Sequence, residues 1–179
     1  AGAPPTLAYT VQYRYDSAGR KIAQQDANGA ASAQTWAYNT TGQLTGRTDG
    51  AVTYSYSFSN AGKLLQTRAS NGQSLDYQYD GAGQLIRIQD NYLGQTSTYT
   101  YDLAGNRRSD AAYVKGGGAN GTDAGGTYIY TYDDLHRLVQ SQRGTDELFQ
   151  YYYDGAGRTV ASRSVLYGRT GGYDEYRYN

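Results

Sequence analysis

The chain has 179 residues, and its 16 basic and 16 acidic side chains give a net charge of zero. A dedicated nucleic-acid or anionic-membrane binder carries excess basic charge, so the composition argues against both kinds of partner. Cysteine is absent, which excludes disulfides, thiolate nucleophiles and cysteine-based metal sites.

One motif recurs along the chain, starting with "YRYDSAGRKIAQQD" at Tyr13. It returns as "YQYDGAGQLIRIQD" (Tyr77), "YTYDLAGNRRSD" (Tyr99), "YTYDDLHRLVQSQ" (Tyr130) and "YYYDGAGRTVASR" (Tyr151), with weaker copies at Trp36 and Tyr54. The same turn position marks seven copies: Gly19, Gly42, Gly62, Gly83, Gly105, His136 and Gly157. These anchors are 20 to 23 residues apart, except for one interval of 31 that contains the glycine-rich segment 115–126. A truncated eighth copy begins at Tyr176 and reaches Asn179.

Each copy reads aromatic–x–aromatic–Asp–x–x–Gly–x–apolar, which predicts a strand that enters a four-residue turn. An aspartate at the first position of a turn caps the backbone, and a glycine at the fourth accepts a positive φ. His136 occupies one such glycine position, where we expect backbone strain. The predicted turn caps are Asp16, Asp80, Asp102, Asp133 and Asp154, with Asn39 and Ser59 in the weaker copies.

A second turn signal follows in most copies, so one period contains two strands and two turns. These signals are "DANG" (26–29), "TDG" (48–50), "SNG" (70–72), "DNYLG" (90–94) and "RGTD" (143–146). Seven copies give roughly fourteen strands of about 5–6 residues. Helical periodicity is not evident. We therefore predict an all-β fold, in which tandem hairpins over 1–179 form one domain, a long twisted antiparallel sheet that is a strip or part of a spiral β-shell.

Tyrosine replaces the usual aliphatic core residues, because the chain has 22 tyrosines and only 24 Leu, Ile, Val and Phe together. Alternate residues of a strand share a face, so the two aromatic residues of each copy project together. We expect adjacent copies to stack these rings in ladders. We also expect three arginines that follow the turns to lie over neighbouring rings as cation–π contacts: Arg20, Arg137 and Arg158.

The residues that could perform chemistry have simpler structural explanations. Every copy has the same aspartate, whereas an active site needs different environments for its acid and its base, so no catalytic residue is predicted. His136 is the only histidine, which leaves a zinc site or a nucleophilic triad without its parts. Segment 115–126 lacks the context of a phosphate cradle or a calcium repeat and is expected to be a loop. No metal or cofactor site is predicted.

The "YxYDxxGRL"-like units, from about Tyr9 to Asn179, resemble the YD repeats of the RHS family. That family includes bacterial rearrangement-hotspot and wall-associated proteins, shell subunits of insecticidal toxin complexes, and teneurins. The resemblance implies a spiral β-sheet that closes as a hollow shell around a toxin or another polypeptide, without catalysis by the repeats. The family's C-terminal motif for self-cleavage is missing, so self-processing is not expected.

Three functions follow from this sequence, all without enzymatic activity. The chain is expected to be a scaffold segment of a secreted or cell-surface bacterial shell, whose partners are the remainder of that shell and an encapsulated polypeptide. Alternatively, identical chains pair through exposed sheet edges and form an extracellular filament. A third possibility is an adhesion module in which Trp36 and Tyr38 provide a platform for a cell-surface glycan. No apolar run is long enough to span a membrane.

Overall fold

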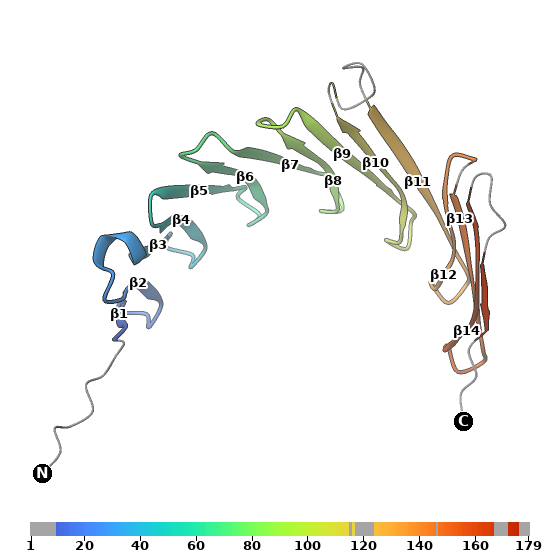
Figure 1. Cartoon of the computed structure of the whole chain (residues 1–179), viewed down its shortest axis with the longest axis horizontal. Helices are drawn as coiled ribbons and strands as arrows, with labels where there is room; N and C mark the ends of the chain where they lie inside the picture. The colour runs from blue at the N-terminus through green and yellow to red at the C-terminus, as the bar shows by residue number, and fades with distance from the viewer. Residues whose placement is uncertain (1–9, 115, 117–123, 146, 167–171, 176–179) are drawn as a thin grey trace, which may run out of the picture. The chain divides into compact units, whose positions relative to one another are not determined.

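The computed structural model describes residues 10–114, 116, 124–145, 147–166 and 172–175. Within these ranges the chain is built from fifteen β-strands and one short 3₁₀ helix (Figure 1). The all-β prediction is therefore confirmed. The truncated copy at 176–179 and most of segment 115–126 lie outside the described residues.

The chain divides into two compact units, Ala1–Asp76 and Tyr77–Asn179, and the boundary lies within strand β7 (Ser74–Tyr79). The first unit contains β1 (Gln12–Tyr15), β2 (Lys21–Gln25), β3 (Gln34–Tyr38), β4 (Leu44–Asp49), β5 (Val52–Phe58) and β6 (Leu64–Ala69). The second unit contains β8 (Leu85–Asp90), β9 (Gln95–Tyr101), β10 (Arg107–Val114), β11 (Ala124–Tyr132), β12 (Leu138–Arg143), β13 (Glu147–Tyr153), β14 (Thr159–Leu166) and β15 (Tyr173–Glu175).

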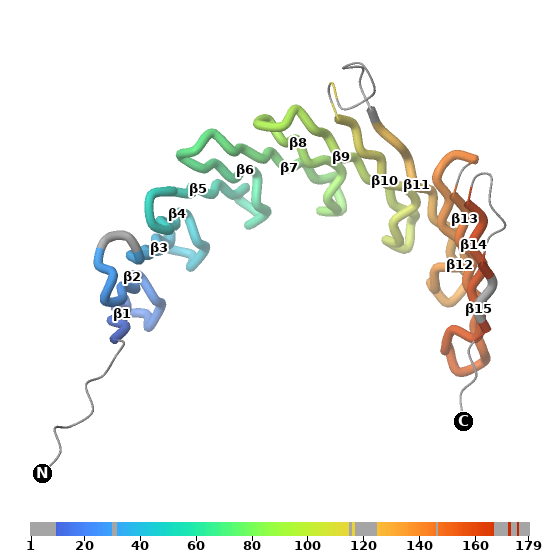
Figure 2. The backbone as a smooth tube through the Cα atoms, in the orientation of Figure 1, coloured from blue at the N-terminus to red at the C-terminus, as the bar shows by residue number. Residues whose placement is uncertain are grey.

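Strands that are neighbours in the sequence are also neighbours in the sheet, in the order β1 to β15. The pairings within each unit are antiparallel, as the direct alternation of strand and turn requires. Figure 2 shows the chain reversing at both ends of the strands within each unit. The prediction of one domain over 1–179 stays a prediction.

The seven anchor turns share one backbone geometry. The fourth residue of each turn donates its N–H to the carbonyl of the first at 2.9 to 3.1 Å, and the first donates to the carbonyl of the fifth at 2.8 to 3.0 Å. The six anchor glycines have φ between 75° and 88°, and His136 has φ 61°. This is a type I turn that leads into a residue of left-handed conformation, a common connection of a three-residue hairpin loop.

The turns at the other end of the hairpins also use left-handed glycines: Gly29, Gly50, Gly72, Gly94 and Gly144. The first of these turns runs directly into the 3₁₀ helix η1 (Gly29–Ser32), which the sequence analysis does not predict. Asp26 accounts for this helical turn, because its carboxylate accepts hydrogen bonds from the backbone of Asn28 and from the hydroxyl of Ser32.

Most hairpins contain a β-bulge close to the anchor turn. In the first hairpin the register changes between Arg14, which faces Ala23, and Tyr15, which faces Lys21. The same shift precedes the aromatic residue next to the turn in five further hairpins: at Tyr38, Phe58, Tyr101, Tyr132 and Tyr153. A bulge increases the local right-handed twist and changes the direction of nearby side chains. Each of these copies thus carries the same local twist beside its turn.

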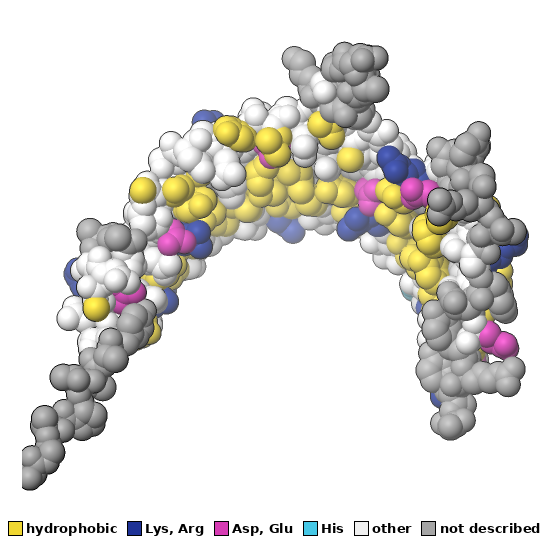
Figure 3. Space-filling model, in the orientation of Figure 1, with side chains coloured by type: hydrophobic (Ala, Val, Ile, Leu, Met, Phe, Trp, Pro, Cys, Tyr) yellow, Lys and Arg dark blue, Asp and Glu magenta, His cyan; other side chains and the backbone are white. Residues whose placement is uncertain are grey.

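The two faces of the sheet differ in burial. In β5 the half-buried residues are Val52, Tyr54, Tyr56 and Phe58, whereas Thr53, Ser55 and Ser57 between them are exposed. We call the side of the paired aromatics the tyrosine face. Among the described residues only Ala161, at 5% exposure, and Ser141, at 8%, are buried. Hydrophobic side chains follow the strands, with charged side chains beside them (Figure 3). The sheet is therefore a single layer whose tyrosine face is half-covered by its own side chains.

We expect His136→Gly to stabilise the protein. A non-glycine residue in the left-handed region costs about 1–2 kcal/mol, and the hydrogen bond that the imidazole forms with Asn106 offsets roughly 0.5–1 kcal/mol of that gain. Urea unfolding of the variant measures the net change, which we expect to be a gain of about 0 to 1.5 kcal/mol. Gly157→Ala at the equivalent turn, where φ is 83°, is the control and should destabilise. A destabilised His136→Gly protein would contradict this account of the turn.

Candidate functional site

The anchor turns are held together by the side chain of their first residue. In all five aspartate turns, Oδ1 accepts the backbone N–H groups of the third and fifth turn residues at 2.8 to 3.0 Å. Asn39 accepts the corresponding pair at 3.1 and 2.9 Å, and the hydroxyl of Ser59 accepts one N–H from Lys63 at 3.1 Å. These carboxylates are committed to the backbone, which leaves them poorly placed to act as acids or bases.

The second carboxylate oxygen binds the side chain of the fifth turn residue. Arg20 Nε lies 2.7 Å from Asp16, Arg158 Nε lies 2.8 Å from Asp154, and Asn106 Nδ2 lies 2.9 Å from Asp102 Oδ2. Arg137 donates to Asp133 in the same way, at 2.7 Å. The fifth residue is thus fixed by its own turn.

These contacts lower the pKa of four of the turn aspartates. The largest cause is the backbone N–H of the fifth residue for Asp16 and Asp154, and its side chain for Asp102 and Asp133. Hydrogen bonds to an ionised carboxylate favour the charged form. The four caps therefore hold their negative charge more firmly than a free aspartate does.

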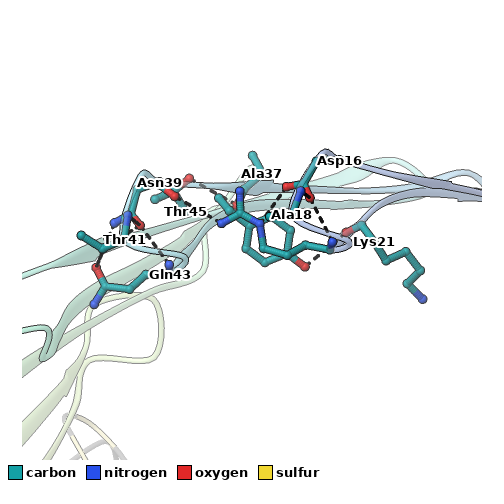
Figure 4. Close-up of polar contacts among 10 residues, drawn as sticks. Asp16, Ala18, Lys21, Ala37, Asn39, Thr41, Gln43 and Thr45 are labelled. Atoms are coloured by element: carbon teal, nitrogen blue, oxygen red, sulfur yellow. Dashed lines mark hydrogen bonds and ion pairs between the residues drawn. The ribbon is translucent and has the colours of Figure 1, made fainter.

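The fixed fifth residue also reaches the next turn along the sheet. Arg20 Nη1 donates to the carbonyl of Asn39 at 3.4 Å, and Gln43 Nε2 donates to the carbonyl of Gly62 at 3.2 Å. In the second unit Arg137 Nη1 donates to the carbonyl of Asp154 at 3.3 Å. Figure 4 shows two successive turns, with Asp16 and Ala18 in one and Asn39, Thr41 and Gln43 in the other. We call this set of contacts the turn brace.

A tyrosine hydroxyl makes a second link between successive hairpins. Tyr38, Tyr101 and Tyr153 are each the last aromatic residue before a turn, and each donates to a backbone carbonyl of the preceding hairpin. The acceptors are the carbonyls of Lys21, Leu85 and Leu138 at 3.2, 2.8 and 2.7 Å. Every acceptor residue directly follows the fifth turn residue of its own hairpin, so this link has the same register in all three places.

Cations lie over the tyrosine rings, as the sequence predicts for Arg20 and Arg137. Their Cζ atoms are 4.7 Å and 4.6 Å from the ring centroids of Tyr38 and Tyr153. The same contact occurs where the sequence analysis does not expect it, including Arg47 over Tyr54 at 4.7 Å. Cation–π contacts of this kind contribute about 0.5–1 kcal/mol at exposed sites.

The stacking of rings between adjacent copies stays a prediction. One stacked pair among the described residues is Tyr128 and Tyr130, which lie on the same strand with ring centroids 6.4 Å apart. The paired aromatics occupy every second strand, so the backbones that carry the rings of adjacent copies are two strand spacings, about 9.5 Å, apart. Aromatic pairs need centroids about 4.5–7 Å apart. The strand between two such rings can supply a contacting group, as Arg47 does between Trp36 and Tyr54.

The second unit carries a polar cluster on its tyrosine face. Tyr130 donates to Asp110 Oδ2 at 2.7 Å, and Arg107 forms an ion pair with the same oxygen at 3.2 Å. Tyr128 donates to Glu147 at 3.0 Å, and Arg143 lies 3.6 Å from that carboxylate. Burial, followed by the hydrogen bond to Asp110, raises the pKa of Tyr130 to about 12. These side chains satisfy one another, which favours a role in holding the strands together.

Trp36 and Tyr38, the predicted glycan platform, both lie half-buried on β3. Lys21 Nζ is 4.2 Å from the Trp36 ring centroid, and Arg20 covers the Tyr38 ring. Each ring therefore has a cation from the preceding hairpin on one of its faces. Glycan binding by this pair stays a prediction.

His136 lies at a turn of the second unit, where its Nδ1 is 2.9 Å from Asn106 Nδ2. The described residues contain no group of three or more His, Asp or Glu side chains that could hold a metal ion. In the same residues, no helix is long and apolar enough to span a membrane.

Comparison with known proteins identifies an RHS repeat within this chain. Residues 79–117, which include two anchor turns, match the family model for the RHS repeat. The chain is also 28% identical, over 123 residues, to double-stranded DNA deaminase toxin A of Burkholderia cenocepacia (strain H111). These matches confirm the predicted resemblance to the RHS/YD-repeat family.

A solved structure shares the fold of this RHS-repeat chain. The crystal structure of TcdB2-TccC3-Cdc42 superimposes over 93% of the chain with a TM-score of 0.73 and 21% sequence identity. The chain spans 10% of that structure's chain and 8% of the deaminase toxin, with 66% of its own residues aligned to the toxin. The match therefore concerns a small part of much longer proteins.

Removing the inter-hairpin hydroxyl bond should weaken the sheet. We expect Tyr101→Phe to destabilise by about 1 kcal/mol, because it leaves the Leu85 carbonyl without this partner and keeps the ring. Chemical unfolding measures the change. Tyr99→Phe on the same strand is the matched control, since within the described residues the Tyr99 hydroxyl forms no hydrogen bond. Equal effects of the two substitutions would show that the hydroxyl link does not contribute.

The lowered pKa values predict loss of stability in acid. A group whose folded pKa is lowered stabilises the protein above its ordinary value, here 3.8, and this contribution is lost as the pH falls through the folded value. Between pH 7 and pH 2 the Asp154→Asn protein should therefore lose less unfolding free energy than the parent. The reciprocal variant Asn39→Asp should lose more. Identical acid dependence in all three proteins would exclude the caps as the cause.

Proposed function

We propose that this chain is a non-catalytic wall segment of a secreted or cell-surface RHS-repeat shell that encloses or displays a polypeptide. The turn brace and the tyrosine hydroxyl links carry the proposal, because they join successive hairpins at several places in both units and contain no free catalytic group. The capping aspartates are bound to backbone, and the polar cluster of the second unit is internally paired. These contacts stabilise the sheet and leave these carboxylates without a role as general acid or base.

The similar proteins support a toxin-associated context for this chain. One relative is named as a DNA deaminase toxin, and the solved structure with the same fold is a TcdB2-TccC3-Cdc42 assembly. In both, the aligned region is a small part of the whole protein. We infer that the repeats of this chain serve as the scaffold of a toxin-associated protein, with any catalytic activity residing outside the repeats.

The physical argument for a shell rests on the tyrosine face. A single-layer sheet with a half-buried aromatic face, as in β5 and β9, leaves apolar ring surface beside polar groups. Further repeats can pair with the strand edges through main-chain hydrogen bonds. A bound polypeptide would then be enclosed by a wall held together by the turn braces.

A filament of identical chains is the alternative function, and the exposure of strand β1 supports it. All four residues of β1 are exposed, and Tyr13 and Tyr15 have exposures of 51% and 59%. Exposed edge strands are templates for pairing with another chain. In a filament this edge would accept a second copy.

Sedimentation velocity separates these two functions. We expect a single species of monomer mass from micromolar to hundreds of micromolar concentrations, because a wall segment needs other repeats as neighbours. Polymers that lengthen with concentration would support the filament, and they should disappear on Arg14→Pro, which removes a main-chain donor from β1. The control is Leu103→Pro in an exposed turn position.

Enclosure itself is tested by protease protection. In the native assembly that contains this chain, an associated polypeptide should resist protease while the wall is intact. Combined Arg20→Ala and Arg137→Ala substitutions remove two turn braces and should accelerate its digestion at least several-fold. If every associated polypeptide is digested at the same rate in the parent and the variant, enclosure is the wrong function.

A further inference from the structure

One joint between successive hairpins differs chemically from the turn braces. In each brace the fifth turn residue donates to a main-chain carbonyl, a group that does not titrate. In the turn that begins at Asp102 the fifth residue is Asn106, and its Nδ2 lies 2.9 Å from Nδ1 of His136 in the following anchor turn. We call this contact the Asn106–His136 joint. His136 is the only histidine of the chain, and histidine is the side chain whose charge ordinarily changes between pH 5 and 8.

The orientation of the Asn106 amide is fixed by Asp102. Asn106 Nδ2 also donates to Asp102 Oδ2 at 2.9 Å, and an ionised carboxylate can only accept hydrogen bonds. An amide turned by half a rotation would place its own oxygen against this carboxylate, acceptor against acceptor. The hydrogen bond from Asn106 is the largest cause that lowers the pKa of Asp102, so this carboxylate stays charged in mildly acidic solution. The two hydrogens of Nδ2 are therefore directed at Asp102 and His136.

The imidazole must accept a hydrogen bond at Nδ1 for the joint to form. A neutral imidazole has one donor and one acceptor nitrogen, whereas both nitrogens of an imidazolium donate. The closed joint thus requires a neutral ring with its hydrogen on Nε2. Within the described residues this is the one hydrogen bond of the imidazole. Protonation of His136 places a donor against a donor and breaks the contact.

The surroundings of His136 favour the charged ring in acid. The charged and titratable groups come from its own turn, from the preceding turn and from strands β10 and β11: Asp133, Asp134, Asp102, Arg108, Tyr130 and Tyr132. His136 is exposed, so water also solvates the imidazolium. Asp134 is exposed and has no hydrogen bond or ion pair within the described residues. It can stabilise the imidazolium from the same turn, without any contact to the preceding hairpin.

We propose that the Asn106–His136 joint is a pH-sensitive connection between two successive hairpins, closed at neutral pH and open in acid. The braces keep their main-chain acceptors over the same pH range, so acid loosens the second unit at one defined place. This role also gives a reason for a histidine with φ 61° at an anchor position that is glycine in the other six copies. The proposal does not depend on whether the assembled repeats form a shell or a filament.

Nuclear magnetic resonance of the whole chain tests the joint directly, and a single histidine makes the ring signals unambiguous. We expect the ring nitrogen shifts to show hydrogen on Nε2 at about pH 8 and on both nitrogens at about pH 5. The side-chain amide signal of Asn106 should change with the same midpoint as the ring. In the His136→Asn protein this change should vanish, because asparagine also tolerates a positive φ and its amide oxygen accepts at any pH.

A double-mutant cycle of Asn106→Ala and His136→Gly measures the strength of the joint. The bond from Asn106 to Asp102 is lost with either residue at position 136, so it cancels in the cycle. At about pH 8 we expect the two substitutions to be coupled by a factor of about 2 to 10 in the unfolding equilibrium constant, and at about pH 5 the coupling should disappear. The control is Asn106→Ala in the His136→Asn background, whose effect should be the same at both pH values.

Four results would overturn the proposal. These are a ring that does not titrate between pH 5 and 8, a neutral ring with its hydrogen on Nδ1, an Asn106 amide signal that ignores the titration, and a coupling as large in acid as at neutral pH. The last result would mean that Asp102 retains the imidazolium and the joint stays closed. If the Asn106→Ala protein does not fold, as judged by circular dichroism, the resonance comparison of the parent with His136→Asn decides the question.

Discussion

The spacing of strands in the sheet governs how this protein uses its tyrosines. Because the paired aromatics occupy every second strand, the backbones that carry them in successive copies are about 9.5 Å apart, farther than the centroid distance of an aromatic pair. The intervening strand carries groups that contact the rings on its flank, as Arg47 and Arg143 do. Near the turns, Arg20 and Arg137 perform the same task from the fifth turn position. Guanidinium groups thus pack against the tyrosine rings, as aliphatic side chains pack against one another in an ordinary core.

The sequence predicts the local structure of each copy well, because that structure depends on residues within one turn. The aspartates and glycines of the motif mark the chain reversals, and the fold class follows from their repetition. The η1 helix is missed since it depends on Asp26 and Ser32, a pair outside the motif. The contact of Arg47 with Tyr54 is not predicted, because the sequence pattern does not show which residues of neighbouring strands face one another.

In the candidate sites too, contacts within one turn can be predicted from the sequence, whereas contacts between hairpins cannot. The capping role of Asp16 can be reasoned from its position before a glycine, whereas the reach of Gln43 to Gly62 depends on how two hairpins lie side by side. The position directly after the anchor glycine was a usable signal, since it holds Arg, Gln, Lys or Asn in every copy.

The turn brace affects how the number of repeats in such a chain can change during evolution. Each brace involves only one hairpin and the one that follows, and its donor is the fifth turn residue in all three places. Exchange between two copies within a gene therefore adds or removes one complete period and leaves both new neighbours with compatible partners. A chain of this design can vary in length by recombination while its joints remain intact, and it can accumulate specialised copies one at a time.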